Sequence, residues 1–87
     1  MKPRILVIDD EIQVSGLMSD VLETQGAVID RANSGFEAIR QIQNNTYDLF
    51  ICDQHMPGLS GENVYWSVNL ENPELRHRFL FVTASAD

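Results

Sequence analysis

Two apolar runs in this chain of 87 residues each end in acidic residues. Residues 5–8 are followed by Asp9 and Asp10, and residues 49–52 are followed by Asp53. Uninterrupted apolar runs of this length are typical of strands in a parallel sheet that is covered on both faces. Since parallel strands place their carboxyl ends at one edge of the sheet, the three carboxylates should meet there. Crowded carboxylates repel one another unless a divalent cation that prefers oxygen neutralises them, so the pattern predicts a pocket for a cation of the Mg2+ type.

The rest of the chain alternates between helical and strand patterns. Apolar residues at helical spacing predict a first helix that starts near Asp10 or Glu11. The apolar face of this helix consists of Val14, Leu17, Met18, Val21 and Leu22. Residues 27–32 predict a second strand, and their mixed polarity is typical of an edge strand. Residues 79–82 predict a fourth strand, and residues 69–78 predict a polar loop before it.

Two further helices have recognisable starts. Ser34 and Glu37 have the spacing of a capping box, in which each side chain accepts a hydrogen bond from the other residue's backbone N–H. This second helix should end near Asn44, and a third should begin at Ser60 or Gly61. Four strands that alternate with three helices predict an α/β fold with a doubly wound parallel sheet, in which ligands bind beyond the carboxyl ends of the strands.

Composition argues against several classes of function. The net charge of −7 argues against direct nucleic-acid binding, which needs clustered Lys and Arg. Cys52 is the only cysteine and lies in an apolar run, which excludes a disulfide framework or a cysteine-rich metal site. No apolar stretch approaches the roughly 20 residues of a membrane span, and the N-terminus has no signal-peptide pattern. We therefore expect a cytoplasmic protein that does not bind membranes.

Three segments carry a resemblance to a known family. Asp9 and Asp10 follow the first strand, an Asp-x-x-Met-Pro-x-x-x-Gly motif at residues 53–61 follows the third, and Thr83 follows the fourth. With these segments, the whole chain resembles the receiver domain of bacterial two-component response regulators. The resemblance implies a flavodoxin-like strand order of 2-1-3-4-5 and a function in phosphorelay signal transduction.

The resemblance also implies a role for each site residue. Asp53 would accept a phosphoryl group from a phosphohistidine on a sensor histidine kinase or a phosphotransfer protein. Asp10 and Asp53 would bind Mg2+ or Mn2+ directly, and Asp9 would help through water. The backbone carbonyl of His55 would supply a further oxygen, and the Thr83 hydroxyl would donate a hydrogen bond to the phosphoryl group. The chain would then be a phosphoacceptor and not an enzyme that acts on a separate substrate.

Simpler explanations exist for the same residues. Asp10 could merely cap the first helix, Asp53 could merely start a turn, and Thr83 could merely bind local backbone. The alternative function is a non-phosphorylated pseudo-receiver that works by dimerisation or protein interaction. A third is an aspartyl-phosphate phosphohydrolase, although such enzymes usually need a second Asp at the position where this chain has His55.

Compared with a complete receiver, residues 1–87 are expected to form a partial domain. A complete receiver continues beyond the fourth strand with two further helices and a fifth strand that ends in Lys. Lys2 is the only lysine of this chain, and the first strand separates it from Asp9 by about 23 Å. We therefore expect poor switching, and an exposed fourth strand through which a homo-oligomer could form.

Overall fold

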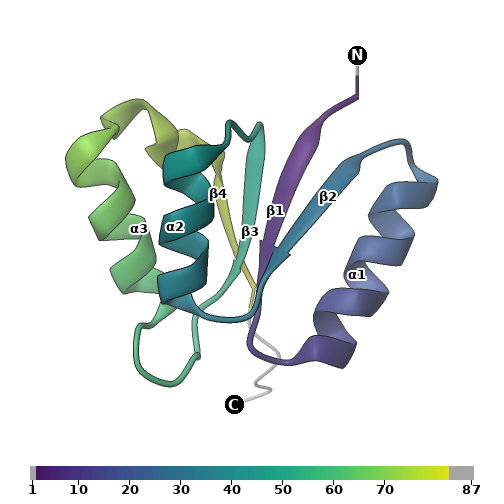
Figure 1. Ribbon diagram of the computed structural model, residues 1–87, viewed down its shortest axis with the longest axis horizontal. Coiled ribbons are helices and arrows are strands. Elements are labelled where there is room, and N and C mark those ends of the chain that lie inside the picture. The colour runs from purple at the N-terminus through teal and green to yellow at the C-terminus, as the bar shows by residue number, and fades with distance from the viewer. Residues whose placement is uncertain (1, 83–87) are drawn as a thin grey trace.

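The computed structural model describes residues 2–82, and Figure 1 shows them as one sheet with helices on both faces. Strands and helices alternate in the predicted order, with one short 3-10 helix, η1, before the last strand. The elements are β1 (Arg4–Ile8), α1 (Ile12–Thr24), β2 (Val28–Ala32), α2 (Gly35–Asn44), β3 (Leu49–Asp53), α3 (Gly61–Glu71), η1 (Pro73–Arg78) and β4 (Phe79–Val82). Across residues 2–82, none of the helices has the length and apolarity that crossing a membrane needs.

All strand pairs of the sheet are parallel, and the strand order is β2-β1-β3-β4. This arrangement confirms the predicted doubly wound α/β fold and the edge position of β2. The two strands with acidic ends, β1 and β3, are neighbours, and Ile8 lies opposite Cys52. Asp9 and Asp53, the residues that follow this pair, therefore reach the same edge of the sheet.

The central strands are buried on both faces, as their uninterrupted apolar runs predict. Figure 1 shows α1 on one side of the sheet and α2 and α3 on the other. Because side chains alternate along a strand, each central strand contributes to two cores. The strand residues buried toward α2 and α3 are Leu6, Ile8, Phe50 and Cys52. Those buried toward α1 are Ile5, Val7 and Ile51.

Helix α1 contacts the sheet with two serines and with only part of the apolar face that its spacing predicts, namely Met18 and Leu22. Its buried residues are Ser15 and Ser19. Their hydroxyls donate to the backbone oxygens of Ile12 and Ser15 at 3.1 and 2.7 Å. A hydroxyl that is hydrogen-bonded in this way can be buried at little cost. As a result part of the predicted apolar face points outward, and Leu17 and Val21 are 69% and 61% exposed.

The prediction of a loop over residues 69–78 was wrong. Helix α3 continues to Glu71, and η1 begins at Pro73, whose fixed φ suits the first position of a helix. Leu75 of η1 packs against the core between α2 and α3. One apolar residue in a polar stretch thus holds this segment against the domain.

The capping box at the start of α2 is only half as predicted. The Ser34 hydroxyl accepts the N–H of Glu37 at 3.1 Å. The Glu37 carboxylate, however, accepts the N–H of Asn33 at 3.3 Å and not that of Ser34. The predicted pair of side chains therefore does accept backbone N–H groups at the start of the helix, but the N–H bound by Glu37 is that of the preceding residue. Its end at Asn44 is as predicted.

Candidate functional site

Three aspartates meet at the carboxyl edge of the sheet, which lies at the bottom of Figure 1. One carboxylate oxygen of each of Asp9, Asp10 and Asp53 lies within 4.8 Å of the others. Asp9 and Asp53 are 4% and 7% exposed, whereas Asp10 is more open to solvent. The geometry thus brings together the three acids that the sequence predicts to meet.

Backbone N–H groups hold the two buried carboxylates in place. Asp9 Oδ1 accepts the N–H of Glu11 at 2.8 Å, and Asp53 Oδ1 accepts the N–H of His55 at 3.1 Å. Each bond runs from a residue two positions further on, as in the turns that Asp side chains commonly form. The local turn role foreseen for Asp53 is therefore real, but it coexists with the cluster of acids.

Asp10 does not cap the first helix. Helix α1 begins at Ile12, its N-cap is Glu11, and it has no side-chain cap hydrogen bond. The simpler explanation for Asp10, helix capping, is thus not realised. Its carboxylate instead lies beside Asp9 and Asp53.

Burial and neighbouring negative charges disfavour the ionised form of Asp9. The pKa of Asp9 is raised chiefly because burial penalises the charged form, and the charges of Asp53, Asp10 and Glu11 raise it further. The hydrogen bond from the N–H of Glu11 acts in the opposite direction and lowers it. The folded protein therefore binds a proton at Asp9 more tightly than the unfolded chain does.

Replacing Asp9 by Asn should stabilise the protein near neutral pH when no divalent cation is present. Because the folded-state pKa of Asp9 is raised, its contribution to stability is complete below the unfolded pKa and is lost as pH rises through the folded pKa. In acid, the variant and the wild type should have the same free energy of unfolding. As pH rises toward neutral, that of the variant should become increasingly the larger. Urea unfolding with a chelator present, at a series of pH values, measures this difference. A wild type that remains the more stable protein at neutral pH would contradict it.

The segment after Asp53 approaches the site closely because it has glycines at two positions, Gly58 in the loop and Gly61 at the start of α3. Gly58 has a φ of +82°, which lets the chain turn sharply after Pro57. Ser60 then caps α3, since its hydroxyl accepts the N–H of Asn63 at 3.2 Å. A Cβ atom on Gly61 would lie 2.2 Å from the carbonyl oxygen of Asp53. The spacing of the 53–61 motif thus lets α3 begin in contact with the backbone of the central acid.

Two further site residues are predicted, His55 and Thr83. The side chain of His55 is exposed, and a role for its backbone carbonyl stays a prediction. Thr83 lies outside the described residues, so its role stays a prediction too. Val82, the residue before it, lies opposite Asp53 in the β3–β4 pair.

Cys52 does not take part in the chemistry of the site. Its side chain is fully buried among apolar residues of the core. Burial, together with the charges of Asp53 and Asp9, raises the pKa of the Cys52 thiol to about 12. It is therefore a neutral thiol near neutral pH and not a nucleophile.

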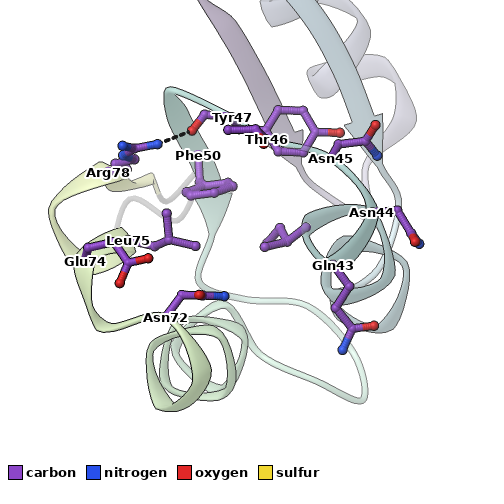
Figure 2. Close-up of a pocket in the computed structure, with 11 residues that line it drawn as sticks. Gln43, Asn44, Asn45, Thr46, Tyr47, Phe50, Asn72, Glu74, Leu75 and Arg78 are labelled. Atoms are coloured by element: carbon purple, nitrogen blue, oxygen red, sulfur yellow. Dashed lines mark hydrogen bonds between the residues drawn. The ribbon is translucent and has the colours of Figure 1, made fainter.

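A pocket lined by polar and aromatic residues lies away from the three acids. It has a volume of about 440 Å3 and lies between α2 and η1, near the opposite end of β3 (Figure 2). Tyr47 and Phe50 line it together with amide side chains and Arg78, which donates to the Tyr47 carbonyl at 2.7 Å. The pocket and the acid cluster are thus separate features.

Comparison with known proteins identifies the family. The family model of the response regulator receiver domain matches residues 5–87. This chain belongs to the response regulator receiver family. The match confirms the family to which the sequence motifs point, and with the strand order it makes this chain a receiver domain of the two-component type.

Named relatives agree with this assignment. The receiver is 38% identical over 58 residues to a protein named transcriptional regulatory protein CpxR homolog of Haemophilus influenzae, and 40% identical over 60 residues to probable histidine kinase 1 of Oryza sativa subsp. indica. These matches cover 67% and 69% of this chain. The chain spans only 25% and 6% of these two relatives.

A solved structure agrees with the fold and the family. The response regulator protein TrrA of Thermotoga maritima, described as in complex with Mg2+-BeF, is 35% identical, with a TM-score of 0.84. The match covers 99% of this chain and 72% of that chain.

The residues present at the receiver's acid cluster fit a hard divalent cation. Receiver domains bind Mg2+ at an acidic pocket, and here three carboxylates converge within 4.8 Å. The donors are all oxygens, which Mg2+ and Mn2+ prefer over nitrogen or sulfur. The pKa of Asp9 is raised chiefly by burial and further by the neighbouring negative charges, and a bound cation would favour the ionised carboxylate.

Proposed function

We propose that this receiver accepts a phosphoryl group on Asp53 from a histidine kinase or a phosphotransfer protein. The observation that carries the proposal is the position of the Asp53 carboxylate, which is buried beside Asp9 and Asp10 at the carboxyl edge of the sheet. Ligands of doubly wound sheets bind at this edge. The family supports the donor, because receiver domains take phosphoryl groups from sensor histidine kinases.

The proposed step is a transfer between two nucleophiles. A carboxylate oxygen of Asp53 attacks the phosphorus of the phosphohistidine; the new O–P bond forms as the P–N bond breaks, and the histidine leaves with the electron pair of that bond. The N–H of His55 holds one oxygen of the Asp53 carboxylate at 3.1 Å and so fixes the direction of the other. The chain thereby takes part in its own phosphorylation and is not an enzyme with a separate substrate.

Asp9, Asp10 and Asp53 are the residues that would hold Mg2+ or Mn2+, with the His55 carbonyl as a further proposed ligand. When bound, the cation neutralises charge that would otherwise oppose the approach of an anionic phosphoryl group. Asp53 remains the reacting residue, because it is one of the two buried carboxylates and it occupies the acceptor position of the family motif. Asp9, the other buried acid, is held by the N–H of Glu11.

Incubation of the purified chain with Mg2+ and a small phosphodonor tests the proposal. We expect an acid-stable, hydroxylamine-sensitive adduct of one phosphoryl group, which peptide mapping locates on Asp53. The adduct should not form when a chelator removes the cation. A folded sample that forms no adduct would contradict the phosphoacceptor function and would favour the alternative, a non-phosphorylated interaction module.

A cytoplasmic location and the lack of nucleic-acid binding stay predictions.

Self-association through β4 also stays a prediction. Within residues 2–82, β4 is an edge strand of the sheet, and Leu80 on it is 51% exposed. Edge strands with exposed apolar residues pair readily with other chains. Light scattering should therefore show a molecular mass that rises with protein concentration, less so for Leu80→Lys than for Leu70→Lys on α3. A monomer at all concentrations would contradict this expectation.

A further inference from the structure

An arginine on β2 connects that strand to the first turn of α1. The guanidinium of Arg31 donates to the Ser15 hydroxyl from Nε at 3.2 Å and from Nη2 at 3.0 Å. Its Nη2 also donates to the carbonyl oxygen of Ile12 at 2.9 Å. Ser15 itself is fully buried. Arg31 therefore binds the beginning of α1 at both a side chain and the backbone.

The next residue of β2 binds the end of β1. The carbonyl oxygen of Ala32 accepts the N–H of Asp9 at 3.0 Å. Two successive residues of β2 thus hold the β1–α1 turn at both of its ends, Asp9 on one side and Ile12 on the other. Asp10 lies between these two points of attachment.

Apart from the Asp9 carboxylate, which accepts the N–H of Glu11 at 2.8 Å, few other side-chain contacts fix this turn. Helix α1 has neither a side-chain N-cap nor an acidic residue in its first turn, and its buried residues are two serines and not large apolar side chains. Apolar packing alone therefore anchors the start of α1 weakly. A planar guanidinium that bridges two acceptors restricts geometry more than a single bond does.

We propose that Arg31 is a positioning residue for the cation site. Through Ser15 and Ile12 it fixes the β1–α1 turn, so that the Asp10 carboxylate stays beside those of Asp9 and Asp53. This inference rests on the proposed function, because it assigns Arg31 a part in binding the cation that phosphorylation needs.

The sign of the effect separates positioning from simple electrostatics. Arg31 carries a positive charge, and a positive charge near a cation site opposes cation binding. If only charge mattered, removing it would strengthen binding. If positioning dominates, removing it weakens binding, since residues that orient metal ligands typically contribute 10- to 100-fold to affinity.

Titration with Mn2+, followed by the electron paramagnetic resonance signal of the free ion, tests the inference. We expect Arg31→Met to weaken Mn2+ binding about tenfold. Arg31→Lys keeps the charge but loses the planar fork and should also weaken binding, and Ser15→Ala should do so by about threefold. Arg4→Met is the matched control, because Arg4 is also a strand arginine but binds Asp30 at 3.1 Å near the other end of the sheet. It should leave Mn2+ affinity unchanged.

The outcomes distinguish this inference from the proposed function. A wild type that binds no Mn2+ overturns the proposed cation site, and the role of Arg31 is overturned with it. If the wild type binds and Asp10→Asn weakens binding, but Arg31→Met binds as tightly or more tightly, only the positioning role is wrong. Should Arg31→Met fail to fold, wild-type affinity in both Arg31→Lys and Ser15→Ala would overturn the role equally.

Discussion

Asp53→Asn should lose phosphoryl acceptance at least 100-fold, to the background of the assay. The Asn side-chain amide cannot act as the nucleophile. It has the same shape as the carboxylate, however, and its oxygen can still accept the N–H of His55, a hydrogen bond of 3.1 Å in the wild type. The fold should therefore survive. Without a cation the variant should be no less stable than the wild type, because one of three mutually repelling charges is gone. Mass spectrometry after incubation with Mg2+ and a small phosphodonor measures the adduct.

Asp48→Asn is the matched control for this experiment. Asp48 immediately precedes β3, near the end opposite Asp53, and its carboxylate also accepts a backbone N–H, that of Arg4 at 2.8 Å. This variant should form the adduct to the wild-type extent. An undiminished adduct in Asp53→Asn would exclude Asp53 as the acceptor, and equal loss in both variants would mean that the loss is not specific to Asp53. An adduct mapped to Asp9 or Asp10 would reassign the acceptor within the cluster.

The acid cluster could be predicted from sequence because it depends on local pattern and on one topological rule. An uninterrupted apolar run indicates a buried parallel strand, and an acid directly after it must lie at the carboxyl edge. The sequence does not, however, say which strands are neighbours. The order β2-β1-β3-β4 was implied by family resemblance and not by the residues themselves.

Features that depend on tertiary contacts escaped prediction. Helical spacing marks Leu17 and Val21 as one apolar face with Met18, but it cannot tell that only Met18 of these three packs against the sheet, beside hydrogen-bonded serines. The helix η1 was not predicted because its segment is polar, and only the contact of Leu75 with the core holds it against the domain. The role inferred for Arg31 had no sequence signal at all, because a basic residue in an edge strand is ordinary.

Gly61 is the clearest case of such a tertiary requirement, and Gly61→Ala should destabilise the protein by about 3 kcal/mol or more. Helix propensity alone favours Ala by roughly 0.5–1 kcal/mol. The added Cβ, however, would lie 2.2 Å from the Asp53 carbonyl oxygen and 3.0 Å from the Cys52 sulfur. Because backbone cannot move aside as a flexible side chain can, the whole start of α3 must shift, and the cost should reach the upper end of that for overpacked cores.

The shift should also damage the site, because α3 begins against the backbone of Asp53. We expect weaker Mn2+ binding and less phosphorylation together with the lower stability, as measured by urea unfolding and by the two assays above. Gly16→Ala is the matched control, since a Cβ there would lie 3.6 Å from the Arg31 guanidinium, an ordinary contact. Because only helix propensity acts at this position, Gly16→Ala should stabilise the protein by up to about 1 kcal/mol. Equal stabilisation by both substitutions would mean that the close approach of α3 to Asp53 is not a constraint on the fold.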